Sequence, residues 1–139
     1  MRDRSFRYLT VSVLCLALLA IVMFIIWIVN RQVEVMHKKE VLAISEQLHN
    51  DMVHFARDND GHLPESLQAM IDSGYIESIP VNPFTDTPFE LFEGSARTGS
   101  GMLEFIVINR DDEGEPIECE IRLYPKEIDG MVITTCIRK

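Results

Sequence analysis

The chain has 139 residues, of which 47% are hydrophobic and 25% are charged, so its length and composition fit one small domain. Its formal net charge of −9 argues against a nucleic-acid partner, because contacts to phosphate need a basic surface. The apolar residues are unevenly spread. Residues 8–29 form a run of 22 residues without a charge, about 33 Å of helix, which is enough to cross a hydrocarbon core of roughly 30 Å. This run excludes a simple soluble protein and predicts a lipid bilayer as a partner.

A basic head, residues 1–7, precedes this transmembrane segment and carries Arg2, Arg4 and Arg7. The run is longer than the apolar region of a signal peptide, and no cleavage site of small residues follows it, so we expect an uncleaved anchor. Basic residues are denser before the span than after it. This asymmetry predicts a single-pass protein of the inner (cytoplasmic) membrane, with its N-terminus in the cytoplasm and its C-terminal domain periplasmic or otherwise extracytoplasmic.

Residues 30–60 are predicted to continue the helix as an amphipathic stalk. No Gly or Pro interrupts the chain before Gly61, which is expected to take the left-handed conformation that ends a helix. Four apolar residues recur at spacings of 7, 4 and 3 on one helical face, namely Val41, Leu48, Met52 and Phe55. We expect this stripe to form a helix-packing interface with a partner. The alternative is that it packs entirely on the chain's own sheet.

The globular part, residues 61–139, combines a short helix with strands. Pro64 in a first turn and Gly74 as terminator predict a helix over 64–73. Three prolines within 79–89 exclude a central strand there and predict an ordered, extended loop. Apolar patterning predicts an antiparallel meander of strands at about 102–109, 117–124 and 131–138. The expected fold class is α+β: a long N-terminal helix, transmembrane and then amphipathic, packed on a small antiparallel sheet of three to four strands.

Two cysteines in the globular part are predicted to lie opposite each other. If residues 125–130 form the loop of the last hairpin, Tyr124 faces Met131, and the same register places Cys119 opposite Cys136. Cross-strand neighbours at this spacing need little adjustment to form a disulfide, which suits a small domain in an oxidising compartment. We therefore predict a disulfide. Two buried free thiols are the alternative, and a metal site is a minor third reading.

Other chemistry is hard to assemble from these residues. The histidines, at 37, 49, 54 and 62, have no spacing that suits a helical metal site, and we interpret them as solvated or packing residues. The acidic turn over 111–118 fits either calcium ligands or, more simply, a charged hairpin tip. No phosphate-binding loop or nucleophile motif is present. We expect no enzymatic activity, no cofactor, and no metal-binding residues.

The order of these segments resembles type IV pilin-like proteins, most closely the major pseudopilins of type II secretion systems. The stretches that carry the resemblance are FARDNDGHLP at 55–64, GYI at 74–76 and IPVNPF at 79–84, each at the place where the family has a similar motif. The head differs from the family's leader, because no glycine precedes the span and no acidic residue lies within it. We therefore expect this anchor to remain unprocessed.

The resemblance implies a non-enzymatic, membrane-anchored structural component of a type II secretion or type IV pilus-like machine. Such a protein acts by helix packing and protein contacts, and its partners are other pilin-like subunits or membrane proteins of the secretion machine. The alternative is a stand-alone, single-pass extracytoplasmic binding or sensor module that has a pilin-like fold and does not assemble into filaments.

Overall fold

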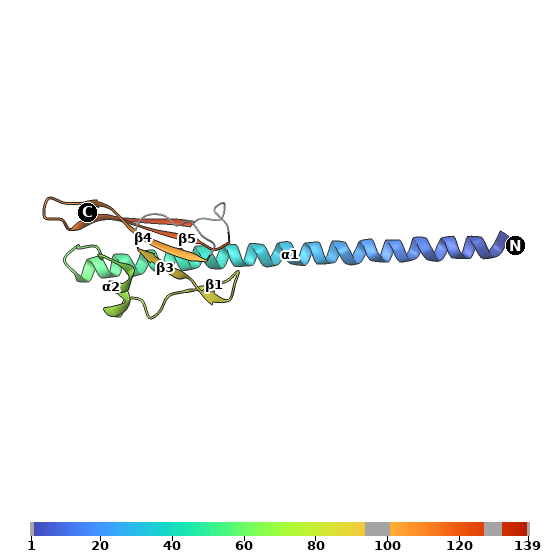
Figure 1. Ribbon diagram of the computed structural model, residues 1–139, viewed down its shortest axis with the longest axis horizontal. Helices are drawn as coiled ribbons and strands as arrows, with labels where there is room; N and C mark the ends of the chain where they lie inside the picture. Colours follow the sequence, from blue (N-terminus) through green and yellow to red (C-terminus); the bar gives the residue numbers. More distant parts are fainter. Residues whose placement is uncertain (1, 94–100, 127–131, 139) are drawn as a thin grey trace. The chain divides into compact units, whose positions relative to one another are not determined.

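The computed structural model describes residues 2–93, 101–126 and 132–138 (Figure 1). One α-helix, α1 (Arg2–Asp58), takes in both the predicted span and the predicted amphipathic segment without a break. The chain divides into two units, Met1–Met36 and His37–Lys139, and α1 contributes to both of them. The other described elements belong to the second unit, and the fold is α+β.

The C-terminal end of α1 depends on Gly61. This residue has a φ of +87°, and its N–H donates to the carbonyl oxygen of Ala56 at 2.7 Å. A residue with a Cβ adopts this conformation only with strain, whereas glycine adopts it freely. The left-handed conformation predicted for Gly61 is therefore confirmed. Asp60, directly before it, also has a positive φ of +54°, so the two residues together turn the chain out of the helix after Asp58.

The short helix α2 (Leu67–Asp72) begins later than the sequence predicts. The hydroxyl of Ser66 accepts a hydrogen bond from the N–H of Ala69 at 3.0 Å, so Ser66 is the residue that caps the helix. Pro64 consequently lies before the cap instead of in the first turn. The helix stops at the predicted terminator, Gly74, whose φ is +76°.

Four strands form the main sheet in the order β3-β4-β5-β6. Their bounds are β3 (Glu90–Glu93), β4 (Met102–Arg110), β5 (Pro116–Tyr124) and β6 (Val132–Ile137). The last three correspond to the three predicted strands, although residues 127–131, which include most of the predicted hairpin loop, lie outside the described residues. β4, β5 and β6 pair antiparallel, as the meander requires.

β3 corrects the prediction of a purely antiparallel sheet. It pairs parallel with β4, with Glu90 opposite Met102, so the sheet is mixed. β3 has four residues and follows directly on the proline-rich segment, which leaves too little alternation to identify a strand. Parallel neighbours are also usually joined by longer crossovers, so the short separation along the chain gave no indication of this pairing.

The proline-rich segment forms a small hairpin of β1 (Val81–Asn82) and β2 (Thr87–Pro88). Asn82 is fully buried and holds the segment to the end of β5. Its side-chain amide donates to the carbonyl oxygen of Pro125 at 2.7 Å, and its side-chain oxygen accepts from the N–H of Phe84 at 3.0 Å. Both ends of this buried amide are thus satisfied, which fixes the loop in place.

The core of the second unit lies between α1, α2 and one face of the sheet. Figure 1 shows the strands running alongside the green, C-terminal part of α1. The buried hydrophobic residues of this core include Val41, Leu48, Met52, Leu67, Met70, Leu103, Phe105, Cys119, Ile121 and Leu123. A buried hydroxyl pair adds a polar link, because the Ser45 and Thr134 side-chain oxygens lie 2.6 Å apart and join α1 to β6.

This packing predicts the effect of truncating the helix at its most buried position. Met52 is 0% exposed, so Met52→Ala should lower the free energy of unfolding of the globular unit by about 2 to 5 kcal/mol. Glu46→Ala, on the exposed side of the same helix, is the control and should change it by about 0.5 kcal/mol or less. Chemical unfolding of the full chain in detergent measures both. Equal effects of the two substitutions would contradict this packing.

Candidate functional site

In the first unit, most large apolar side chains of α1 are exposed. From Val11 to Val29 the large apolar side chains are 49 to 66% exposed, apart from Ile28, which is partly buried. Part of α1 is long and apolar enough to cross a membrane, and the described side chains of that stretch are not covered by protein. Lipid would remove this apolar area from water, while every backbone group stays bonded within the helix. The side chains of the basic head, residues 1–7, lie outside the described residues.

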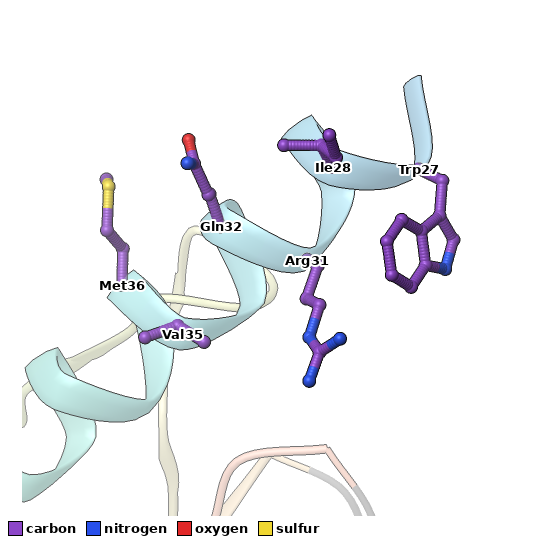
Figure 2. Close-up of a pocket in the computed structure, with 6 residues that line it drawn as sticks. All are labelled: Trp27, Ile28, Arg31, Gln32, Val35 and Met36. Atoms are coloured by element: carbon purple, nitrogen blue, oxygen red, sulfur yellow. The ribbon is translucent and has the colours of Figure 1, made fainter. Parts of the chain in front are cut away.

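A shallow groove of about 490 Å³ marks the end of the apolar run (Figure 2). Its lining comes from one stretch of α1 and consists of Trp27, Ile28, Arg31, Gln32, Val35 and Met36. The Arg31 guanidinium lies 5.5 Å from the centre of the Trp27 ring, a cation–π arrangement. Trp27 also stacks on Phe24 with ring centres 6.0 Å apart. The groove therefore combines an aromatic wall with one positive charge.

The predicted helix-packing stripe lies in the second unit, inside the protein. Val41, Leu48 and Met52 are at most 3% exposed and belong to the core, while Phe55 is partly buried against it. The Phe55 ring meets the Tyr75 ring edge-on at 5.1 Å. The stripe thus packs on the chain's own elements, which is the alternative that the sequence left open. A surface for a partner has to be sought elsewhere on α1.

Two large apolar side chains of α1 stay exposed within the second unit. Leu42 is 56% exposed and Val53 is 45% exposed. They are eleven residues apart, close to three helical turns, so they project from the same side of the helix. That side lies about a third of a turn round the helix from the buried stripe. Helical spacing alone did not single out this pair, because the buried stripe is the stronger pattern.

Cys119 and Cys136 are register partners on β5 and β6, so the predicted pairing is confirmed. Both cysteines are buried, and both are free. The predicted disulfide is therefore corrected to the alternative of two buried thiols, and the Cys119 thiol lies 3.7 Å from the carbonyl oxygen of Pro64. Burial, together with the neighbouring Cys136, raises the pKa of Cys119 to about 12. Burial also raises the pKa of Cys136, so neither group is a ready nucleophile.

A polar cleft of about 470 Å³ lies where α1 ends, lined by Phe55, Asp58, Asn59, Asp60, His62, Leu63, Glu65, Ala69 and Glu115. The Glu65 carboxylate accepts two hydrogen bonds from Arg110, at 3.0 and 2.8 Å, and these bonds lower the pKa of Glu65. His62 Nδ1 lies 3.8 Å from Glu115 Oε2, beyond hydrogen-bond distance. In the described part of the chain, no group of three or more His, Cys, Asp or Glu side chains is arranged to hold a metal ion.

In the acidic turn between β4 and β5, the Asp111 carboxylate accepts hydrogen bonds from the backbone of the turn itself. One carboxylate oxygen of Asp111 accepts the N–H groups of Glu113 and Glu115 at 3.0 and 2.8 Å. The other lies 3.2 Å from the Arg138 guanidinium. The bond from the N–H of Glu115 is the main cause that lowers the pKa of Asp111. Asp111 therefore stabilises the hairpin as an anion.

Glu104 on β4 forms a charged cluster with Glu120, Arg122 and Tyr124 on β5, which the alternation of apolar and polar residues along β5 does not predict. Glu104 and Tyr124 are 4 and 3% exposed, and the Tyr124 hydroxyl donates to Glu104 at 3.1 Å. Arg122 bonds to Glu120 and lies 3.7 Å from Glu104. Burial, and then the bond to Glu104, raises the pKa of Tyr124. The pairing register of β4 and β5 would have indicated this cluster, because it places Glu104 opposite Arg122.

Comparisons of this chain with protein families, with curated proteins and with solved structures found no match. The resemblance to type IV pilin-like proteins therefore rests on the residues at 55–64, 74–76 and 79–84 and on the order of the elements.

The state of the cysteine pair can be measured by alkylation. In the folded full chain carrying Cys15→Ser, Cys119 and Cys136 should resist iodoacetamide because both thiols are buried and have raised pKa values. After unfolding without a reductant, both should become alkylated, as intact mass would show. Alkylation that requires prior reduction would mean that the disulfide predicted from the sequence forms after all.

The Asp111 turn predicts a pH-dependent contribution to stability. A carboxyl with a lowered pKa stabilises the fold above its unfolded pKa, near the ordinary 3.8, and loses this effect as the pH falls through the lower folded value. Asp111→Asn should therefore lower the unfolding midpoint at pH 7, and the difference from the unmodified chain should shrink below pH 3.8. Asp112→Asn is the control of equal charge, with little expected effect. A pH-independent difference for Asp111→Asn would contradict the assignment.

Proposed function

We propose that this protein is a non-enzymatic, single-pass membrane anchor with a pilin-like extracytoplasmic domain, acting as a structural component of a type II secretion or type IV pilus-like machine. Its N-terminus lies in the cytoplasm and its globular unit outside the inner membrane. It works through helix packing and contacts with other pilin-like subunits or machine proteins. The observation that carries the proposal is that α1 joins a bare apolar span to the core of a folded domain.

The apolar span supports membrane anchoring, because its exposed side chains need contact with an apolar environment outside the protein. Its large side chains from Val11 to Val29, apart from the partly buried Ile28, are about half to two thirds exposed, and the bilayer supplies an apolar medium over that length. Three arginines precede it, which favours retention of the head on the cytoplasmic side. One uncleaved helix of this kind holds the second unit close to the membrane surface.

The exposed flank of α1 supports protein contacts beyond the membrane. Leu42 and Val53 lie on one side of the helix, next to the face that the sheet covers, and both leave roughly half of their surface in water. A second helix laid along this side would bury both residues together. Subunits anchored in one membrane meet in a fixed orientation, so even a narrow apolar strip can direct their association.

The polar groups of the second unit support a structural role. The Glu65 carboxylate is held by Arg110, the Asp111 carboxylate by two backbone N–H groups, and the Tyr124 hydroxyl by Glu104. Each of these bonds ties one segment of the chain to another or closes a turn. Groups committed in this way stabilise the fold, and none of them is paired with a nucleophile in the manner of a catalytic site.

Photo-crosslinking in intact membranes tests the proposal. A photoreactive amino acid at position 42 should give crosslinked species larger than the monomer, whereas the same group at the buried position 52 should not. Val53→Glu should weaken the association by about 2 kcal/mol, which is roughly a thirtyfold loss of crosslinked product. Val81→Glu, an equally exposed apolar position on β1, is the matched control and should leave the products unchanged.

The outcomes separate the two functions considered for this fold. Crosslinked ladders that depend on residue 53 but not on residue 81 support a subunit of an assembly. A single monomer band from position 42, in membranes where the protein is folded, would contradict it and favour a stand-alone anchored binding or sensor module.

A further inference from the structure

The groove at the end of the apolar run has a composition suited to one kind of ligand. Figure 2 shows Arg31 and Trp27 on the same side of α1, with Ile28, Gln32 and Met36 extending from the other side of the helix. The guanidinium lies 5.5 Å from the ring centre. A cation held over an aromatic face keeps its charge and its N–H donors while its carbon stem is shielded from water.

The position of the groove along the chain sets its depth in a bilayer. Residues 8–29 carry no charge, and Arg31 is the first charged residue after them. Tryptophan favours the boundary between acyl chains and headgroups, because its ring is apolar and its N–H is polar. With Trp27 at that boundary, one further helical turn brings Arg31 to the level of the lipid phosphates.

The chemistry of Arg31 matches a phosphate. A guanidinium presents a planar fork of donors that fits two phosphate oxygens, and the attraction strengthens at the edge of a medium of low dielectric constant. Val35 lies one helical turn after Arg31 and adds apolar surface for the upper acyl carbons, whereas Gln32 and Met36 line the groove from the other side of the helix. Arg31 is the one charged residue that lines the groove, and its positive charge favours an anionic lipid over a zwitterionic one.

We propose that the Trp27–Arg31 groove binds the headgroup phosphate of an anionic phospholipid of the phosphatidylglycerol class, in the leaflet next to the globular unit. This inference rests on the proposed membrane anchoring of α1. It adds a lipid preference that anchoring alone does not require, since an apolar span enters any bilayer of suitable thickness.

The protein contains one tryptophan, so the fluorescence of Trp27 reports on this groove without a label. The full chain is reconstituted into equimolar vesicles of phosphatidylglycerol and phosphatidylcholine, with bromine atoms on the upper acyl carbons of one lipid or of the other. Bromine quenches a nearby indole. We expect brominated phosphatidylglycerol to quench Trp27 more strongly than brominated phosphatidylcholine, corresponding to about a fivefold enrichment of the anionic lipid around the ring.

Substitutions identify the group responsible. Arg31→Gln should remove the difference between the two brominated lipids while leaving quenching by both, because the ring stays at the same depth. Lys39→Gln removes the same charge two turns further from the span and should keep the difference. A difference that survives in Arg31→Gln, or equal quenching by the two lipids in the unmodified chain, would overturn the lipid site and leave the anchor standing. Absence of quenching by either lipid would overturn the anchor itself, and the lipid site with it.

Discussion

The contact between α1 and the sheet is the interaction on which the second unit depends. Val41, Leu48 and Met52 fill the space over one face of β4 and β5, where Ile121 and Leu123 are fully buried. An apolar sheet face has to be covered by another layer, and α1 supplies that layer here. Each such side chain contributes roughly 1.5 to 3 kcal/mol when fully buried. Before residue 30 the apolar side chains of the same helix are exposed. The helix therefore has two parts, one packed on the protein's own core and one with exposed apolar side chains.

Much of the fold follows from periodicity and from the residues that punctuate the chain. The absence of Gly and Pro before Gly61 predicts a continuous helix, and the hairpin register deduced from the last loop places Cys119 opposite Cys136, as found. β3 could not be predicted in this way, because four residues after a proline carry too weak a pattern and a parallel partner is set by tertiary contacts. The start of α2 was misplaced because a proline and a serine compete as the first signal of a helix.

Less of the site was predictable. Helical spacing shows which residues share a face, but it does not show what covers that face, so the stripe through Met52 was assigned to a partner and the chain's own sheet covers it. The cysteine register was correct, whereas bond formation depends on geometry and redox conditions that register does not contain. The burial of Glu104 could not be predicted from its own strand, because its partners Arg122 and Tyr124 come from a different strand. The groove at Trp27 needed side-chain positions as well as sequence spacing.

In the proposed arrangement α1 is covered in two parts, by lipid over residues 11–29 and by the core of the second unit over residues 41–56. Hydrogen–deuterium exchange of the full chain in lipid nanodiscs tests this most directly, because both covers slow the exchange of backbone amides. Two protected stretches should appear, separated by faster exchange between residues 32 and 40, where the described side chains are mostly exposed. Exchange of residues 11–29 as fast as that of residues 32–40 would contradict the account, since this part of the helix would then have no cover at all.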